Sequence, residues 1–163
     1  VLGAGGAARG VMLPILEGKP ARVFIANRTA DTAVNLALRF EVAAKLHGTE
    51  LVGGGFNDLD ATDVFDVVIN ATASSLQAQV PPIPPTVFGP NALAYDMMYG
   101  AEPTVFNQWA ASLNAAATLD GLGMLVEQAA ESFNLWRGVR PESSPVIESI
   151  RANLLLTKSA DIS

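Results

Sequence analysis

Short apolar runs alternate with longer segments of helical periodicity along the chain. The clearest strand pattern is Phe65 to Asn70, whose continuous apolar character is typical of a strand covered on both faces. The other predicted strands are Val1-Leu2, Arg22 to Ala26, Glu50 to Val52, Ala92 to Asp96 and Ala115 to Leu119. Because such strands alternate with helices, we predict an α/β fold of the doubly wound type. It would have a mostly parallel six-stranded sheet with helices on both faces.

The predicted helices lie between these strands and carry apolar residues at helical spacing. They cover Gly6 to Leu16, Thr29 or Asp31 to Leu46, Thr104 to Leu113, Gly123 to Trp136 and Ser144 to Thr157. Two other segments are predicted to be connections. Gly53-Gly54-Gly55 is typical of a turn, and Pro81 to Pro85 of a stiff surface loop, because proline donates no backbone hydrogen bond.

Composition narrows the class of protein. The chain has 163 residues, of which 50% are hydrophobic and 16% charged, and we predict one globular domain over residues 1–163. A net charge of −6 disfavours nucleic acid as a partner. No apolar run approaches the roughly 18 residues of a membrane span. Cysteine is absent, which excludes disulfides. We therefore expect a cytoplasmic protein.

A glycine-rich segment near the start of the chain carries the clearest chemistry. Gly3, Gly5 and Ala8 fit the G-x-G-x-x-G/A pattern, which opens a helix and brings its free N–H groups up to a pyrophosphate. The pattern predicts a Rossmann-like dinucleotide site. A P-loop is excluded because Val11-Met12 stand where that motif needs lysine and serine or threonine.

Asn27-Arg28-Thr29 follows the second predicted strand, where such folds contact the adenosine ribose. A carboxylate is typical of NAD-binding proteins at this place, because it binds the ribose hydroxyls and repels a 2′-phosphate. The guanidinium of Arg28 can instead bind that phosphate with two hydrogen bonds. We therefore predict NADP as the cofactor, although Asp31 adds a negative charge nearby.

Five segments in order resemble the cofactor-binding part of shikimate dehydrogenase. They are Gly3 to Arg9, Asn27 to Thr29, Asn70 to Thr72, Tyr95 to Tyr99 and Asp120 to Ala129, so the resemblance extends from Gly3 to about Ile150. It implies an oxidoreductase that transfers hydride from NADPH to 3-dehydroshikimate and forms shikimate. It also implies two sets of site residues. The cofactor set is Gly3, Ala4, Gly5, Gly6, Ala7, Asn27, Arg28, Thr29, Thr32, Thr72, Met97 and Gly121, and the substrate set is Tyr99 and Gln128.

The resemblance implies that the catalytic residues lie elsewhere. The lysine and aspartate of this family belong to an N-terminal domain that these residues lack, so we predict no catalytic residue here and no turnover by this chain alone. The helix at 144–158 would pack toward that domain. Two departures stand out: Thr32 replaces a basic residue, and Ala73-Ser74-Ser75-Leu76 replaces a loop that commonly contains glycine.

Two other functions fit the same sequence. One is an NADP-binding sensor without catalysis, and the other is a quinate/shikimate dehydrogenase that prefers NAD. We expect a small-molecule substrate, a monomer or homodimer, and no metal, because His47 is the only histidine and Asp63 stands where a calcium loop based on Asp58 and Asp60 needs glycine. Trp109 and Trp136 are predicted to pack in the core or between domains.

Overall fold

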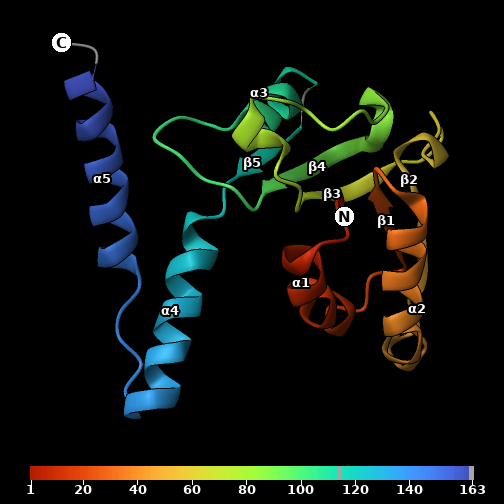
Figure 1. Cartoon of the computed structure of the whole chain (residues 1–163), viewed down its shortest axis with the longest axis horizontal. Coiled ribbons are helices and arrows are strands. Elements are labelled where there is room, and N and C mark those ends of the chain that lie inside the picture. Colours follow the sequence, from red (N-terminus) through yellow and green to blue (C-terminus); the bar gives the residue numbers. More distant parts are fainter. Residues whose placement is uncertain (114, 162–163) are drawn as a thin grey trace.

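A computed structural model of the chain describes residues 1–113 and 115–161 (Figure 1). Helices and strands alternate from the first residues onward, which confirms the α/β class. The α-helices are α1 (Gly6–Glu17), α2 (Ala30–His47), α3 (Val105–Ser112), α4 (Leu122–Arg137) and α5 (Ser144–Asp161). The strands are β1 (Arg22–Asn27), β2 (Glu50–Gly55), β3 (Phe65–Asn70), β4 (Phe88–Asp96) and β5 (Ala117–Leu119). Three short 3-10 helices are η1 (Phe56–Asp58), η2 (Ser74–Gln77) and η3 (Pro85–Val87).

All the strand pairs in the described part of the chain are parallel. β1 pairs with β2, and β3, β4 and β5 form a second sheet in that order. Leu2 lies between the two sheets and makes single parallel bridges to Ala26 and Asn70. The predicted six-stranded sheet is therefore wrong for the residues described, which form five strands in two small sheets. Val1-Leu2 contributes one bridge on each side, too little pairing for a strand.

Helices cover both faces of β1, as predicted, but one face of β3 is open, where Val67 is 47% exposed. On one face, Met12 and Leu16 of α1 and Leu36 of α2 pack against Val23 and Ile25 of β1. On the opposite face, a second apolar cluster contains fully buried Phe106 of α3 together with core residues of β1, β3 and β4. A strand covered on both faces needs apolar side chains on both, and β1 is buried from Val23 to Ala26. The expectation that Phe65 to Asn70 is covered on both faces is wrong, because no helix of the described residues packs over Val67.

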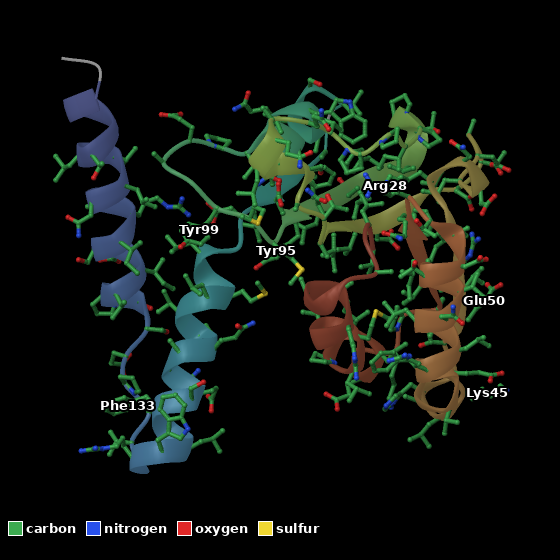
Figure 2. The ribbon with its side chains drawn as sticks, in the orientation of Figure 1. Arg28, Lys45, Glu50, Tyr95, Tyr99 and Phe133 are labelled. Atoms are coloured by element: carbon green, nitrogen blue, oxygen red, sulfur yellow. The ribbon has the colours of Figure 1, made fainter. Side chains whose placement is uncertain are left out.

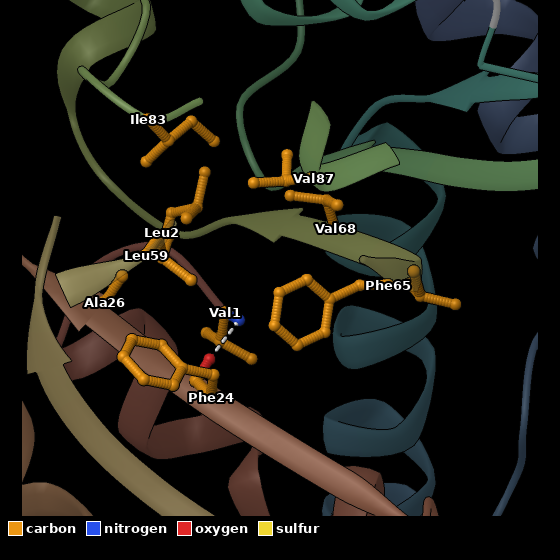
Figure 3. Close-up of a pocket in the computed structure, with 10 residues that line it drawn as sticks. Val1, Leu2, Phe24, Ala26, Leu59, Phe65, Val68, Ile83 and Val87 are labelled. Atoms are coloured by element: carbon orange, nitrogen blue, oxygen red, sulfur yellow. Dashed lines mark hydrogen bonds between the residues drawn. The ribbon is translucent and has the colours of Figure 1, made fainter. Parts of the chain in front are cut away.

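The second cluster encloses a cavity of about 20 Å³ beside Leu2, Phe24 and Phe65 (Figure 3). The backbone nitrogen of Val1 donates a hydrogen bond to the Phe24 carbonyl at 2.8 Å in this region. The cavity has room for about one water molecule, so it cannot be the dinucleotide site.

Two predicted connections are wrong in part. Gly53 to Gly55 belong to β2 instead of a turn, because they pair with the last residues of β1. Gly53 is glycine because α2 packs closely on it: an added Cβ would lie 2.3 Å from the Ala33 carbonyl oxygen. Within the proline-rich segment, Ile83 is buried in the core at 8% exposure. The segment is therefore anchored by an apolar side chain and is more than a surface loop.

The C-terminal helices α4 and α5 form a pair that stands away from the other helices (Figure 1). Arg151 of α5 ties the pair to the main body, because it binds the Asp120 carboxylate at 2.8 Å and donates to the Gly100 carbonyl at 2.8 Å. Trp109 packs in the core against Phe88 at a ring distance of 5.4 Å, as predicted. Trp136 on α4 is 80% exposed, so it is outside the core and its packing between domains stays a prediction.

Candidate cofactor-binding site

A cleft of about 550 Å³ opens at the first turn of α1 and at the carboxyl ends of β1 and β3. Nine of the twelve predicted cofactor residues line it: Gly3, Ala4, Gly5, Gly6, Ala7, Asn27, Arg28, Thr29 and Thr72. This is the edge at which open α/β sheets bind ligands. The structure therefore brings most of the predicted set into one cavity, although its contact with a cofactor stays a prediction.

The first turn of α1 presents unpaired backbone N–H groups to this cleft. Gly5 is the N-cap residue, it provides no side-chain cap, and the turn contains no acidic residue. A Cβ added at Gly5 or Gly6 would meet no atom of the protein within 4 Å, so the space in front of the helix is open. Free N–H groups and the positive end of the helix dipole together favour an anion there.

Gly3 has a different reason to be glycine. Its φ of +99° is one that other residues rarely adopt, and an added Cβ would lie 3.0 Å from the Ala71 carbonyl oxygen. Its N–H donates to the Ala26 carbonyl at 2.7 Å. Gly3 thus lets the chain turn between the ends of β1 and β3 before α1 begins.

Arg28 lies at the junction of β1 and α2 and lines the same cleft as the first turn of α1. Its side chain is exposed and has no ion-pair partner among residues 1–113 and 115–161. The Asn27 amide donates to the Thr29 carbonyl at 3.0 Å and so fixes the turn that carries Arg28. Thr32 is exposed in the first turn of α2 and does not line the cleft.

The segment after β3 forms another wall of the cleft. The side-chain oxygen Oδ1 of Asn70 holds Thr72 in place. It accepts hydrogen bonds from the Thr72 N–H at 3.1 Å and from the Thr72 hydroxyl at 2.6 Å. Sequence reasoning missed the other lining residues, which are Phe56, Ala71, Ala73, Ser74, Gln77, Gln79, Val80, Pro81 and Pro82. Most of them follow β3 at the carboxyl edge of the sheet, and that position was the signal that could have indicated them.

Met97 and Gly121 lie outside this cleft but contact each other closely. A Cβ at Gly121 would be 2.0 Å from the Met97 carbonyl oxygen, so α4 can begin here only with glycine. Met97 lines a separate apolar groove of about 350 Å³ with Tyr95, Met124 and residues of α1. Burial, with a smaller contribution from Asp120, raises the pKa of Tyr95. The packing of Gly121 is a structural reason for the residue that is independent of any cofactor.

The two predicted substrate residues have few contacts. Tyr99 lies in the loop after β4 with 39% of its surface exposed, and Gln128 is exposed on α4. Figure 2 shows Arg28 and Tyr99 toward opposite ends of the sheet edge. The substrate role of both residues stays a prediction, since neither lines the cofactor cleft.

No group of three or more potential metal ligands occurs in the described part of the chain. Among the same residues, no helix combines the length and the apolar character needed to cross a membrane.

Comparison with known proteins decides which family the chain resembles. Residues 121–151 match the family described as shikimate 5'-dehydrogenase C-terminal domain. The shikimate dehydrogenase (NADP(+)) of Cupriavidus necator is 56% identical over 157 residues, which cover 94% of this chain and 53% of that protein. The resemblance to shikimate dehydrogenase is confirmed. The chain spans about half the length of the curated relatives it matches.

Solved structures support the same fold. An Ael1 enzyme from Pseudomonas putida is 42% identical, with a TM-score of 0.78 over 91% of this chain and 52% of its own. A shikimate dehydrogenase solved in complex with NADP+ is 30% identical, with a TM-score of 0.73 over 94% of this chain and 53% of its own. The Rossmann-like α/β fold is therefore shared with shikimate dehydrogenase structures.

Proposed function

We propose that this chain binds NADP(H) and forms the cofactor-binding part of a shikimate dehydrogenase. The whole enzyme would reduce 3-dehydroshikimate to shikimate. One observation carries the proposal: the open N-terminus of α1 and Arg28, which has no ion-pair partner among the residues described, line the same cleft. The names of the relatives support it, since the Cupriavidus necator protein is an NADP(+) enzyme and the 30% identical structure was solved with NADP+.

The residues of the cleft fit the chemistry of this cofactor. The N–H groups after Gly5 would bind the pyrophosphate, with the glycines leaving room for its close approach. Arg28 would bind the 2′-phosphate, and Thr29 and Asn27 would contact the ribose beside it. Bound NADPH would supply the hydride for reduction of the carbonyl. The protein's part is to orient the nucleotide and place positive charge at its phosphates.

The remaining roles belong to the same proposal. Met97 and Gly121 would lie beside the nicotinamide, and Tyr99 and Gln128 would contact the substrate. Residues 1–163 would form one domain, with the helix at 144–158 packing toward the domain that carries the family's lysine and aspartate. Lysine is absent from the lining of the cleft among the residues described. We therefore expect the 163-residue chain alone to bind NADPH without oxidising shikimate. The cytoplasm and a monomeric or homodimeric state stay predictions.

Titration with NADPH and NADH tests the proposal. Arg28→Ala should raise the Kd for NADPH about thirtyfold, because a charge-assisted contact to the 2′-phosphate is lost, and change the Kd for NADH less than about twofold. Arg39→Ala is the matched control, since Arg39 is an exposed arginine on α2 outside the cleft. Equal losses for the two nucleotides would contradict the role of Arg28. An NAD preference in the wild type would favour the quinate/shikimate alternative, and turnover by the chain alone would contradict the absence of catalytic residues.

A further inference from the structure

Asp96 is a buried carboxylate at the carboxyl end of β4 that the proposed function does not use. It is 0% exposed and lies outside the cofactor cleft. A buried carboxylate is costly unless several hydrogen bonds compensate for its lost hydration. Asp96 therefore needs several hydrogen-bond donors around it.

Four donors surround this carboxylate. One oxygen accepts from the Asn70 amide at 3.2 Å and from the Met98 N–H at 3.0 Å. The other oxygen accepts from the hydroxyls of Ser75 and Thr104, each at 2.6 Å. These donors come from the end of β3, the loop after β4, the 3-10 helix η2 and the N-cap of α3. Asp96 thus joins four segments of the chain at one point.

One of these segments forms a wall of the cofactor cleft. Ser74 and Gln77 of η2 line the cleft, and Ser75 lies between them with its side chain on Asp96. The backbone bonds of Leu76, Ala78 and Gln79 go to Ala73, Ser75 and Ser74, so they are local to the segment. The Ser75 hydroxyl, which also lies 3.2 Å from the Asn70 amide, is therefore a tie between this wall and the buried carboxylate.

We propose that the hydrogen bond from Ser75 to Asp96 is a latch that positions residues 72–79 for the bound dinucleotide. Ser75 is then a positioning residue for the cofactor, and the inference rests on the proposed function. The cleft wall in this chain is held by a side chain in addition to its backbone.

Substitution of Ser75 tests the latch with little risk to the fold, because Asp96 keeps three of its four donors. Ser75→Ala should raise the Kd for NADPH about fivefold and that for NADH to the same extent, since the loop serves both nucleotides. Ser75→Thr keeps the hydroxyl and should restore both values to within about twofold. Ser112→Ala is the control, because its hydroxyl bonds only locally to the Trp109 carbonyl at 2.6 Å on α3.

Amide exchange gives a readout that does not depend on the nucleotide. In Ser75→Ala without nucleotide, the N–H groups of Leu76 and Ala78 should exchange about fivefold faster, while those of α1 stay unchanged. Unchanged exchange and unchanged affinity in Ser75→Ala would overturn the latch while leaving the proposed function intact. Absence of NADPH binding by the wild type would overturn both the latch and the proposed function. Faster exchange with unchanged affinity would show that the bond stabilises the loop without positioning it for the nucleotide, which also overturns the latch.

Discussion

The cofactor cleft and the α4–α5 pair differ in which of their groups are left without partners. At the cleft, the N–H groups of the first turn of α1 and the guanidinium of Arg28 have no partner in the part of the chain that the structure describes. At the α4–α5 pair, Arg140 of the connecting loop binds Glu127 and Glu131 of α4. Large apolar side chains of α4 are exposed there instead: Leu135 is 84% exposed and Trp136 is 80% exposed. Free polar groups indicate an anionic ligand, whereas exposed apolar groups indicate a surface for packing.

This difference explains why the predicted phosphate-binding residues lie together in one cleft, whereas the predicted substrate-binding residues do not. The phosphate-binding half depends on the backbone of α1 and on Arg28, and both line the same cleft. The substrate half depends on Tyr99 and Gln128, which are exposed and form no cavity with the cleft. The following substitutions test whether the two regions behave independently.

The largest expected effect is at Gly121, where the start of α4 packs against the loop after β4. Gly121→Ala should lower the free energy of unfolding by about 3 kcal/mol, because the new Cβ would meet the Met97 carbonyl at 2.0 Å and backbone must move. Urea denaturation measures this effect. Gly123→Ala is the matched control two residues on, where a Cβ meets nothing within 4 Å, and should stabilise α4 by about 0.5 kcal/mol. Equal stability of the two variants would refute the packing argument.

A smaller effect, confined to binding, is expected at Gly5. Gly5→Ala places a Cβ in open space at an extended backbone position with φ of −84°, so the folded chain should tolerate it. The same methyl would occupy the place proposed for the pyrophosphate, and the Kd for NADPH should rise about tenfold, or about 1.4 kcal/mol. Fluorescence titration and urea denaturation of one sample separate the two properties. A lower free energy of unfolding with an unchanged Kd for NADPH would show that Gly5 is needed for the fold and not for the nucleotide.

The smallest effect is expected at Arg151, in the other region. Arg151→Ala removes a partly exposed ion pair with Asp120 and should cost about 1 kcal/mol of the local stability of α5. Amide exchange should become faster along α5 and stay unchanged in α1, with the Kd for NADPH within about twofold of the wild type. A large loss of NADPH affinity would show that the two regions are coupled.

The sequence predicted the elements near the cleft well because local chemistry determines them. The pattern Gly3-x-Gly5-x-x-Ala8 requires a turn and a helix start, and the structure has both. The position of Arg28 follows from the end of a strand with continuous apolar pattern. In each case, neighbours in the sequence carry the physical cause.

The errors arise where distant residues decide the structure. Gly53 is in a strand because it pairs with Ile25 of β1, and no neighbour in the sequence shows this. Ile83 is buried because the core reaches the proline-rich segment. The bond from Ser75 to Asp96 joins residues 21 apart and was equally invisible. Periodicity reports which face of an element is apolar, but it does not report what packs on that face.

A crystal structure of the chain with NADP+ tests the central claim most directly. The account predicts a pyrophosphate within hydrogen-bond distance of the N–H groups of Gly6 and Ala7, and a 2′-phosphate bound by the guanidinium of Arg28. A nucleotide bound in the apolar groove at Met97 alone, or with its 2′-phosphate away from Arg28, would contradict the account.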